Sequence, residues 1–334
     1  MTTMTSHDVL YAVERLRGIA VRTPLLTSTA VDSFLGRTVV VKAENQQRTG
    51  SFKLRGAYNA VAALGEADRD AGVVGGSSGN HAQALALSAR LLHSTATVVI
   101  PADAPTAKVE AIQALGARIH TYDHTKERRD AIVHQLAYQS GLTIVPSSND
   151  SRVIAGAGTV AWEMLQEAPN LSAIVVPVGG GGLLAGTALA AQAHNPRMQV
   201  IGVEPVTGND VHRSLRAGRP VPIPAPVTIA DGLRHTEPAS RAFEIIRQLV
   251  TDVITVPENE IADAMAFLWS HYRTAAEPSG AVALAGLLRA AHRLPDGPVG
   301  VVVSGGNVDW PAYRQLLDIA MERKGRAHVA PVLR

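Results

Sequence analysis

The sequence contains no cysteine, which excludes disulfide bonds, thiolate metal sites and cysteine nucleophiles. It also has no apolar run of membrane-spanning length, so no membrane association is expected. The first residues lack a basic segment followed by an apolar stretch, which argues against a signal peptide and predicts a cytoplasmic protein. The formal net charge is only +2, and no basic patch is interleaved with aromatic residues, so nucleic acid is not an expected partner.

Apolar and charged residues occur in the proportions of a folded globular protein. Of the 334 residues, 46% are hydrophobic and 18% are charged, which suits one large α/β domain or two smaller ones. Short apolar runs alternate with amphipathic stretches, a pattern that predicts a parallel sheet covered by helices. The predicted strands include Thr38–Lys42, Thr97–Ile100, Arg118–Tyr122, Ala173–Val178, Gln199–Val203 and Val299–Val303. The predicted helices include Ser6–Gly18, Phe52–Leu64, His81–Leu92, Ala107–Leu115, Leu183–His194, Glu258–His271 and Ala281–His292.

Lys53 lies in a Gly-Ser turn and begins a predicted helix. The positive end of a helix dipole disfavours an ammonium ion. It therefore favours the neutral, nucleophilic amine that a lysine needs to form a Schiff base. A surface lysine at a helix start is the alternative interpretation.

Three further turns are rich in glycine or serine, and in open α/β sheets such turns meet at a ligand crevice. Residues 75–81, Gly-Gly-Ser-Ser-Gly-Asn-His, place hydroxyls, an amide and backbone N–H groups at a helix start, which suits a carboxylate; a simple N-cap is the alternative. Residues 179–182 are successive glycines that let several N–H groups point at one phosphate. In residues 304–307, Ser-Gly-Gly-Asn, the hydroxyl has two candidate partners, a ring nitrogen or the next turn.

The glycine turn also fits another class of site. Gly180-x-Gly182-x-x-Ala185 matches a loose dinucleotide fingerprint, and Glu204 ends the next predicted strand at a distance suited to a ribose hydroxyl. A nicotinamide-dependent oxidoreductase is therefore a remote alternative, although it gives no role to Lys53 or to the Ser-Ser-Gly-Asn turn.

The order of these motifs resembles that of the fold type II, or β-family, pyridoxal-phosphate enzymes, specifically the threonine/serine dehydratase and serine racemase group. The resemblance is carried by residues 50–57, 77–83, 178–183, 202–205, 230–232, 277–281 and 304–307. It implies an α/β fold like that of tryptophan synthase β, with two open twisted α/β domains. Residues 1–49 and 148–334 would form the large cofactor-binding domain. Residues 50–147 would form a small inserted domain that closes over the substrate.

The resemblance implies pyridoxal 5'-phosphate as cofactor and a role for each matched residue around it. Lys53 would bind the cofactor as a Schiff base and later act as the base at Cα, while Phe52 would stack near the pyridine ring. Asn80 would hydrogen-bond the phenolic oxygen, and Ser304 would face the ring nitrogen. The phosphate would be held by Gly179, Gly180, Gly181 and Gly182.

The resemblance also implies how a small amino-acid substrate is bound. Ser77, Ser78 and His81 would bind its carboxylate. Arg129 lies where some members of the group use an arginine for this purpose, and a solvated helix face is the alternative. Ser148 stands in a segment that departs from the His-Pro-Asn type sequence common in the group, at a position where an asparagine often lies near the cofactor.

Two carboxylates form a further candidate site. Glu204 and Asp210, with the backbone carbonyl of Gly208 between them, offer oxygen ligands for a hard divalent cation. The resemblance supports this assignment, with Mg²⁺, Ca²⁺ or Mn²⁺ as the ion. A helix cap beside a solvated aspartate is the alternative.

The resemblance therefore implies a β-elimination that converts a small β-hydroxy-α-amino acid, L-threonine or L-serine, to a 2-oxo acid and ammonia. Racemisation needs an acid or base on each face of the substrate carbon. Lys53 and Ser78 would supply these two groups, so a serine racemase is the alternative. A 3-hydroxyaspartate dehydratase is a further alternative, because the second serine of this turn also occurs in such enzymes. The resemblance implies a homodimer.

Overall fold

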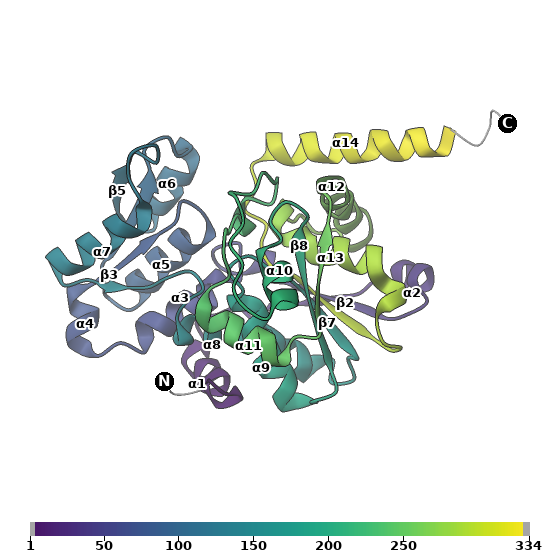
Figure 1. Ribbon diagram of the computed structural model, residues 1–334, viewed down its shortest axis with the longest axis horizontal. Coiled ribbons are helices and arrows are strands. Elements are labelled where there is room, and N and C mark those ends of the chain that lie inside the picture. The colour runs from purple at the N-terminus through teal and green to yellow at the C-terminus, as the bar shows by residue number, and fades with distance from the viewer. Residues whose placement is uncertain (1–3, 330–334) are drawn as a thin grey trace.

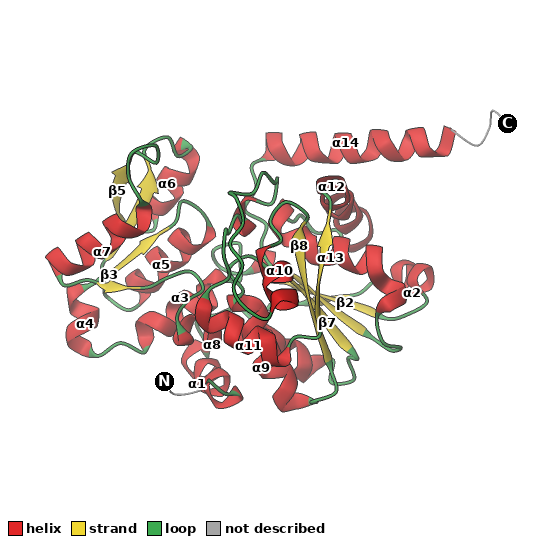
Figure 2. Ribbon diagram, in the orientation of Figure 1, coloured by secondary structure: helices red, strands yellow, loops and turns green. Residues whose placement is uncertain are grey.

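The computed structural model describes residues 4–329 and contains two separate β-sheets, which Figures 1 and 2 show side by side. The larger sheet has the order β1-β2-β10-β7-β8-β9, and all its neighbouring strands are parallel except the pair β1 and β2. The smaller sheet has the order β5-β4-β3-β6 and is parallel throughout. The strands are β1 (Leu25–Leu26), β2 (Val39–Ala43), β3 (Val73–Gly76), β4 (Ala96–Pro101), β5 (Arg118–Tyr122), β6 (Thr143–Ile144), β7 (Ala173–Pro177), β8 (Gln199–Pro205), β9 (Asp252–Val256) and β10 (Val299–Val303).

Helices pack around both sheets (Figure 2). The α-helices are α1 (Ser6–Leu16), α2 (Thr29–Leu35), α3 (Lys53–Ala62), α4 (Glu66–Ala71), α5 (Asn80–Leu91), α6 (Thr106–Ala114), α7 (Arg129–Ser140), α8 (Ser151–Glu167), α9 (Gly182–His194), α10 (Asp210–Ala217), α11 (Ser240–Leu249), α12 (Glu258–Phe267), α13 (Pro278–Ala290) and α14 (Trp310–Val329). The shorter helical turns are η1 (Glu44–Gln46), η2 (Asp231–Leu233), η3 (Leu268–Tyr272) and η4 (Ala291–Arg293). None of the helices within residues 4–329 is long and apolar enough to cross a membrane.

The larger sheet is buried on both faces, as expected for a parallel sheet between two layers of helices. Side chains alternate along β2, so that Val39 and Val41 pack against α12 and α13, whereas Val40 packs against α8 and α9. All residues of β7 are buried. This three-layer arrangement confirms the predicted α/β fold.

The smaller sheet is built entirely from strands between Val73 and Ile144, inside the stretch predicted to form the small domain. The larger sheet draws its strands from both sides of that stretch. The domain boundaries themselves, at residues 49/50 and 147/148, stay a prediction.

Glycines let α3, the helix that begins at Lys53, pack unusually close to α8. A Cβ atom on Gly156 would lie 2.3 Å from the backbone oxygen of Arg55, and a Cβ on Gly56 would lie 2.8 Å from that of Val153. Neither contact leaves room for a side chain. The position of Lys53 therefore depends on backbone-to-backbone packing between these two helices.

A buried cluster of charged side chains fixes the same helix to the larger sheet. Arg55 forms paired hydrogen bonds of 2.8 Å each with Glu44 and of 2.7 and 2.8 Å with Glu163. Lys42 completes the cluster with a 2.8 Å ion pair to Glu163. Burial by itself lowers the pKa of Arg55, but the two carboxylates outweigh it and raise the pKa above its ordinary value. Arg55 therefore stays charged and holds the first turn of α3 in place.

Arg55→Met is expected to lower the free energy of unfolding by about 3–5 kcal/mol, because the fully buried Glu44 carboxylate loses its charged partner and Glu163 keeps only Lys42. Urea unfolding followed by circular dichroism measures this loss. The matched control is Arg22→Met, which removes a largely exposed pair with Glu167 and should cost less than about 1 kcal/mol. An equally small loss for both variants would show that the buried cluster adds no more than a surface ion pair.

Candidate active site

Lys53 is the first residue of α3, and Phe52 is its N-cap. The Lys53 Nζ atom donates a hydrogen bond of 3.1 Å to the backbone oxygen of Ser147 and lies 4.8 Å from the centre of the Phe52 ring. Burial lowers the pKa of Lys53 to about 8, although the charge of Glu277 acts in the opposite direction. A substantial fraction of this amine is therefore neutral and nucleophilic near physiological pH.

The four-glycine turn lies between β7 and α9 and has the shape of an anion site. Gly181 has a φ of 86°, in the left-handed region that favours glycine. A Cβ on Gly180 would lie 2.3 Å from the Ser148 hydroxyl, and one on Gly179 would lie 2.9 Å from the His235 ring. The first N–H groups of α9 have no partner within the helix, so they and its dipole favour a negative charge. The turn therefore fits a phosphate group.

The Ser-Ser-Gly-Asn turn joins the end of β3 to the start of α5. The N–H of Gly79, the N-cap of α5, donates to the Ser77 hydroxyl at 3.2 Å. Ser77 and Ser78 are both half-buried. These hydroxyls and the N-terminal N–H groups of α5 can donate to a carboxylate.

The His81 ring is oriented differently from these donors. Its Nε2 lies 2.9 Å from the backbone oxygen of Val145, which can only accept, so Nε2 carries the proton. Burial lowers the pKa of His81 to about 4, and the charge of Lys53 adds to this effect. The neutral ring then presents Nδ1 as an acceptor, and this atom is buried without a hydrogen-bond partner. The carboxylate-binding role predicted for His81 therefore fits its backbone N–H better than its ring.

Arg129 begins α7, and its side chain lies over the end of β3. A Cβ on Gly76 would lie 2.8 Å from the Arg129 Cδ atom, which places the arginine beside the turn that carries Ser77. The side chain is 47% exposed and contacts Asp130 at 3.1 Å. Arg129 is thus adjacent to the predicted carboxylate site and open to solvent, and its role stays a prediction.

Ser304, at the end of β10, lies next to the lysine turn. Its backbone oxygen accepts from the N–H of Phe52 at 3.0 Å, and Ser51 forms a β-bridge with Gly305. The Ser304 side chain is buried, with Oγ 3.5 Å from the backbone oxygen of Ser279. Two turns that are about 250 residues apart in the sequence thus come together at one edge of the larger sheet.

Glu204, near the end of β8, and Asp210, at the start of α10, form a buried pair of carboxyl groups. Glu204 accepts hydrogen bonds of 3.0 and 2.8 Å from the backbone N–H groups of Val211 and His212. Both oxygens of Asp210 are buried, and the carboxyl groups of Asp210 and Glu204 hydrogen-bond to each other. Burial raises the pKa of both groups, that of Asp210 to about 7, and the charge of Asp210 adds to the effect on Glu204.

The two carboxylates alone do not make a complete ligand set for a metal ion. In the part of the chain that the structure describes, no group of three or more histidine, cysteine or acidic residues is arranged so that it could hold a metal ion. A cation at Glu204 and Asp210 would therefore need backbone oxygens, such as that of Gly208, to complete its shell.

Three side chains in this region were given no role by the sequence. Glu277 accepts a 2.7 Å hydrogen bond from Asn80, and Asn307 donates to Asn80 at 2.7 Å. His235 lies against Gly179 and Gly180 of the glycine turn. Glu277 and Asn307 both lie in motifs that carry the family resemblance. Glu277 directly precedes Pro278, the first residue of α13, and an acidic residue is common at any helix start, so its position alone did not indicate a role.

The lowered pKa of Lys53 generates a prediction for the cofactor-free protein. Competitive labelling with trace acetic anhydride is expected to modify Lys53 with a midpoint near pH 8, because only the neutral amine reacts. Lys126, whose side chain is 79% exposed, serves as the internal control in the same sample. Labelling quantified by peptide mass spectrometry would contradict the prediction if Lys53 titrated at the ordinary lysine value of about 10.4.

Comparison with known proteins agrees with this geometry. The sequence profile of the family "Pyridoxal-phosphate dependent enzyme" matches residues 16–305. The chain is 47% identical over 93% of its length to the L-threo-3-hydroxyaspartate ammonia-lyase of a Pseudomonas species, of which 98% is covered. It is 36% identical over 97% of its length to the L-threonine ammonia-lyase of Thermotoga maritima, of which 80% is covered.

A solved structure leads to the same family. Maize serine racemase superposes with a TM-score of 0.89 at 36% identity, over 97% of this chain and all of that one. This similarity confirms the predicted fold type II architecture. Pyridoxal phosphate is the cofactor of the matched family, so the dinucleotide hypothesis for the glycine turn is set aside. The chain belongs to the family of pyridoxal-phosphate dependent enzymes.

Proposed function

We propose that this protein catalyses β-elimination from a small β-hydroxy-α-amino acid, L-threonine or L-serine, with release of a 2-oxo acid and ammonia. The observation that carries the proposal is the Lys53 amine, which is enclosed at the start of α3 and has a pKa lowered to about 8 by burial. Such an amine can both bind an aldehyde cofactor and remove a proton.

The residues present fit pyridoxal phosphate. The N–H groups of Gly179–Gly182 and the start of α9 would hold its phosphate, and the Ser304 hydroxyl would face its ring nitrogen. Asn80 would donate to its phenolic oxygen. When bound, the cofactor withdraws the electron pair that is left when the Cα proton departs. The Ser304 hydroxyl would not keep that nitrogen protonated, which elimination tolerates because the electron pair left at Cα forms the Cα–Cβ double bond while the β-hydroxyl departs with the C–O bonding pair.

The substrate would be held at the start of α5. The Ser77 and Ser78 hydroxyls and the N–H groups of this helix would bind the α-carboxylate, with Arg129 beside them. Lys53 would take the Cα proton. Closure of the small domain over this turn, which we also propose, would exclude water during the reaction.

A specific observation favours a dicarboxylic substrate as the second candidate. Burial lowers the pKa values of His81 and His235, and the charge of Arg129 lowers both further, so this arginine faces the space beside the two rings. A second substrate carboxylate would be stabilised there. The similarity to an L-threo-3-hydroxyaspartate ammonia-lyase supports this alternative.

Substitution of Lys53 and Ser78 separates elimination from racemisation. In Lys53→Ala, the release of ammonia from L-threonine, L-serine and L-threo-3-hydroxyaspartate should fall by at least about 10²–10⁴-fold, because the base is lost. In Ser78→Ala, ammonia release should persist, while any racemisation of L-serine, measured by chiral chromatography, should disappear. Lys126→Ala is the control. Ammonia release by Lys53→Ala at the rate of the parent protein would refute the proposal.

We also propose that a divalent cation, Mg²⁺ as the first choice, binds at Glu204, Asp210 and the carbonyl of Gly208. The support is the buried carboxyl pair itself, in which Asp210 hydrogen-bonds to Glu204 and burial raises the pKa of both groups. A cation there would compensate the repulsion between the two carboxylates and fix the start of α10 against the end of β8.

Thermal unfolding tests the cation site. Mg²⁺ is expected to raise the melting temperature of the parent protein, with a rise that grows with the logarithm of its concentration above the dissociation constant. Asp210→Asn should abolish this rise, because it removes one of the two charges. Asp252→Asn, which changes a partly exposed carboxylate near Arg293, is the control. A Mg²⁺-dependent rise that is unchanged in Asp210→Asn would place the ion elsewhere.

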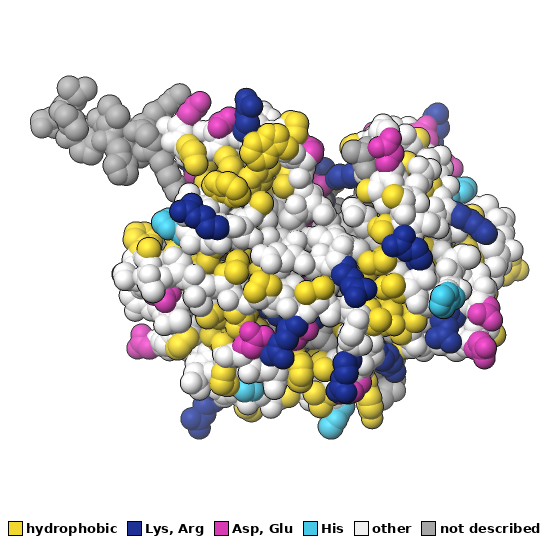
Figure 3. All heavy atoms as spheres, turned by 180° about the vertical axis from the view of Figure 1, so that it is seen from behind, with side chains coloured by type: hydrophobic (Ala, Val, Ile, Leu, Met, Phe, Trp, Pro, Cys, Tyr) yellow, Lys and Arg dark blue, Asp and Glu magenta, His cyan; other side chains and the backbone are white. Residues whose placement is uncertain are grey.

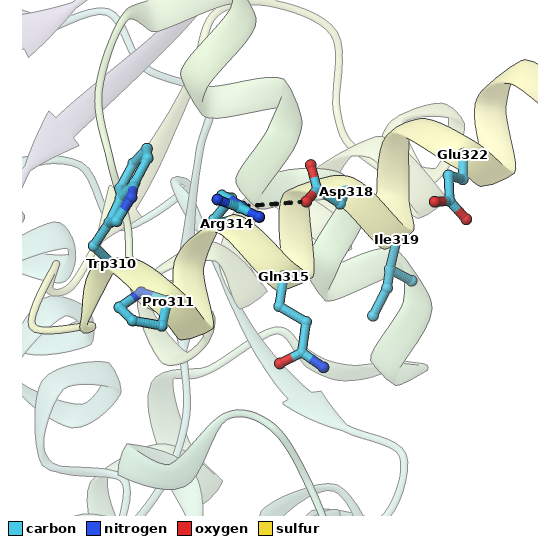
Figure 4. A pocket seen from close by; sticks show the side chains of 7 residues that line it. All are labelled: Trp310, Pro311, Arg314, Gln315, Asp318, Ile319 and Glu322. Atoms are coloured by element: carbon cyan, nitrogen blue, oxygen red, sulfur yellow. Dashed lines mark ion pairs between the residues drawn. The ribbon is translucent and has the colours of Figure 1, made fainter.

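The homodimer implied by the resemblance is likewise our proposal, and a cytoplasmic location stays a prediction. Figure 3 shows apolar side chains gathered at one end of the larger lobe, and the exposed apolar residues of α14 and of the nearby η3 include Trp269, Trp310, Ile319 and Met321. An open pocket along the same helix is lined by Trp310, Pro311, Arg314, Gln315, Asp318, Ile319 and Glu322 (Figure 4). The exposed apolar residues Trp310, Ile319 and Met321 on α14 support contact with a second subunit.

A further inference from the structure

A chain of side-chain hydrogen bonds runs along one wall of the candidate site and ends at a buried carboxyl group. The Asn307 Nδ2 atom donates to the backbone oxygen of Thr49 and to the Asn80 Oδ1 atom, at 2.7 Å each. Asn80 Nδ2 in turn donates to Glu277 Oε1 at 2.7 Å. The chain links the lysine turn, the turn after β10, the start of α5 and the start of α13.

The chemistry of these groups fixes the direction of each hydrogen bond. A backbone carbonyl only accepts, so the atom of Asn307 that contacts Thr49 is its NH₂ group. The same NH₂ group contacts Asn80, which must present its oxygen there. The Asn80 NH₂ group therefore faces Glu277, and it has two hydrogens. One is bonded to Glu277, and the other is the donor that Asn80 can offer to a bound cofactor.

The main chain holds Glu277 rigidly at the first turn of α13. Its N–H donates to the backbone oxygen of Gly305 at 3.1 Å, and its own backbone oxygen accepts from Gly280 and Ala281. The residue is 4% exposed, and a Cβ on Gly305 would lie 2.4 Å from its Oε1 atom. The carboxyl group thus has little freedom to turn away from Asn80.

Three charged side chains surround this carboxyl group from other elements. Lys53 of α3 is one, since the charge of Glu277 acts on its amine. Asp231 of η2 and Lys108 of α6 are the others, and they form an ion pair of 2.9 Å with each other. Burial raises the pKa of Glu277 to about 8, and Asp231 adds to the rise, whereas the Asn80 hydrogen bond and Lys108 oppose it.

We propose that Glu277 is a positioning residue that, together with Asn307, clamps the Asn80 amide with one N–H directed at the phenolic oxygen of the cofactor and sets the charge around the Lys53 amine. This inference rests on the proposed function, because it assumes that pyridoxal phosphate binds at Lys53. Glu277 would then be a second proton-binding group, in addition to Lys53, on the side of the site where Asn80 lies.

The charge state of Glu277 and the charge state of Lys53 then depend on each other. When Glu277 is ionised, its charge stabilises the ammonium form of Lys53 and raises the pKa of the amine. When Glu277 is protonated, its Oε1 atom still accepts from Asn80, so the clamp persists in both charge states. Substitution of Glu277 can therefore separate its effect on the orientation of Asn80 from the effect of its charge on Lys53.

The test compares Glu277→Gln with Glu277→Ala. Glutamine keeps an oxygen that accepts from Asn80, so the dissociation constant for pyridoxal phosphate should stay within about 3-fold of the parent value, whereas alanine should raise it about 10-fold or more. Fluorescence titration of the cofactor-free proteins measures these constants. Glu260→Gln, which removes a charge at an exposed pair with Arg289, is the matched control and should change nothing.

The charge effect has its own readouts. In Glu277→Gln, the midpoint for acetic anhydride labelling of Lys53 should move to lower pH, because the negative charge that opposes its deprotonation is gone. In the cofactor-loaded protein, the pH profile of the visible absorption band should shift in the same variant and not in Glu260→Gln.

The outcomes separate this inference from the proposed function. A parent protein that develops no visible band with pyridoxal phosphate overturns both. A parent protein with the band, but with the same labelling midpoint and pH profile in Glu277→Gln, overturns the charge effect proposed for Glu277. Equal cofactor affinity in the alanine and glutamine variants, with circular dichroism showing both folded, overturns the clamp.

Discussion

The buried contact between Arg55 and the carboxylates of Glu44 and Glu163 determines where the lysine helix lies. The guanidinium group meets both carboxylates through paired hydrogen bonds, a geometry that lysine cannot reproduce. Because α3 begins only two residues before Arg55, the position of the Lys53 amine is set by this contact. The position of the site therefore depends on this cluster of charged side chains, in which the positive and negative groups balance, at the larger sheet.

The site contains two buried groups, Lys53 and Glu277, whose pKa values are shifted in opposite directions. The pKa of the Lys53 amine falls because burial disfavours its charge, and the pKa of the Glu277 carboxyl rises for the same reason. Both groups therefore titrate close to neutrality. Burial thus gives the site two groups that can exchange protons, and no unusual residue type is needed for this.

Strong local patterns allowed much of this fold to be predicted from the sequence. Mostly apolar runs located β2, β7 and β10, although β2 contains Lys42, and the motif order identified the family and the lysine. The two-residue strands β1 and β6 are too short to leave a pattern, and β3 ends in glycines that read as a turn. The proton on the His81 ring and the partner of Asn80 depend on Val145 and Glu277, which are distant in the chain, so local sequence does not reveal them.

The close packing of α3 on α8 has a consequence for how this protein can change. Alanine at Gly156 would collide with the main chain at Arg55, and alanine at Gly56 would collide with the main chain at Val153. Substitutions that normally favour helices would therefore push the two helices apart here. Most of α3 is buried, and at this seam any gain in helix propensity would come at the expense of the position of Lys53.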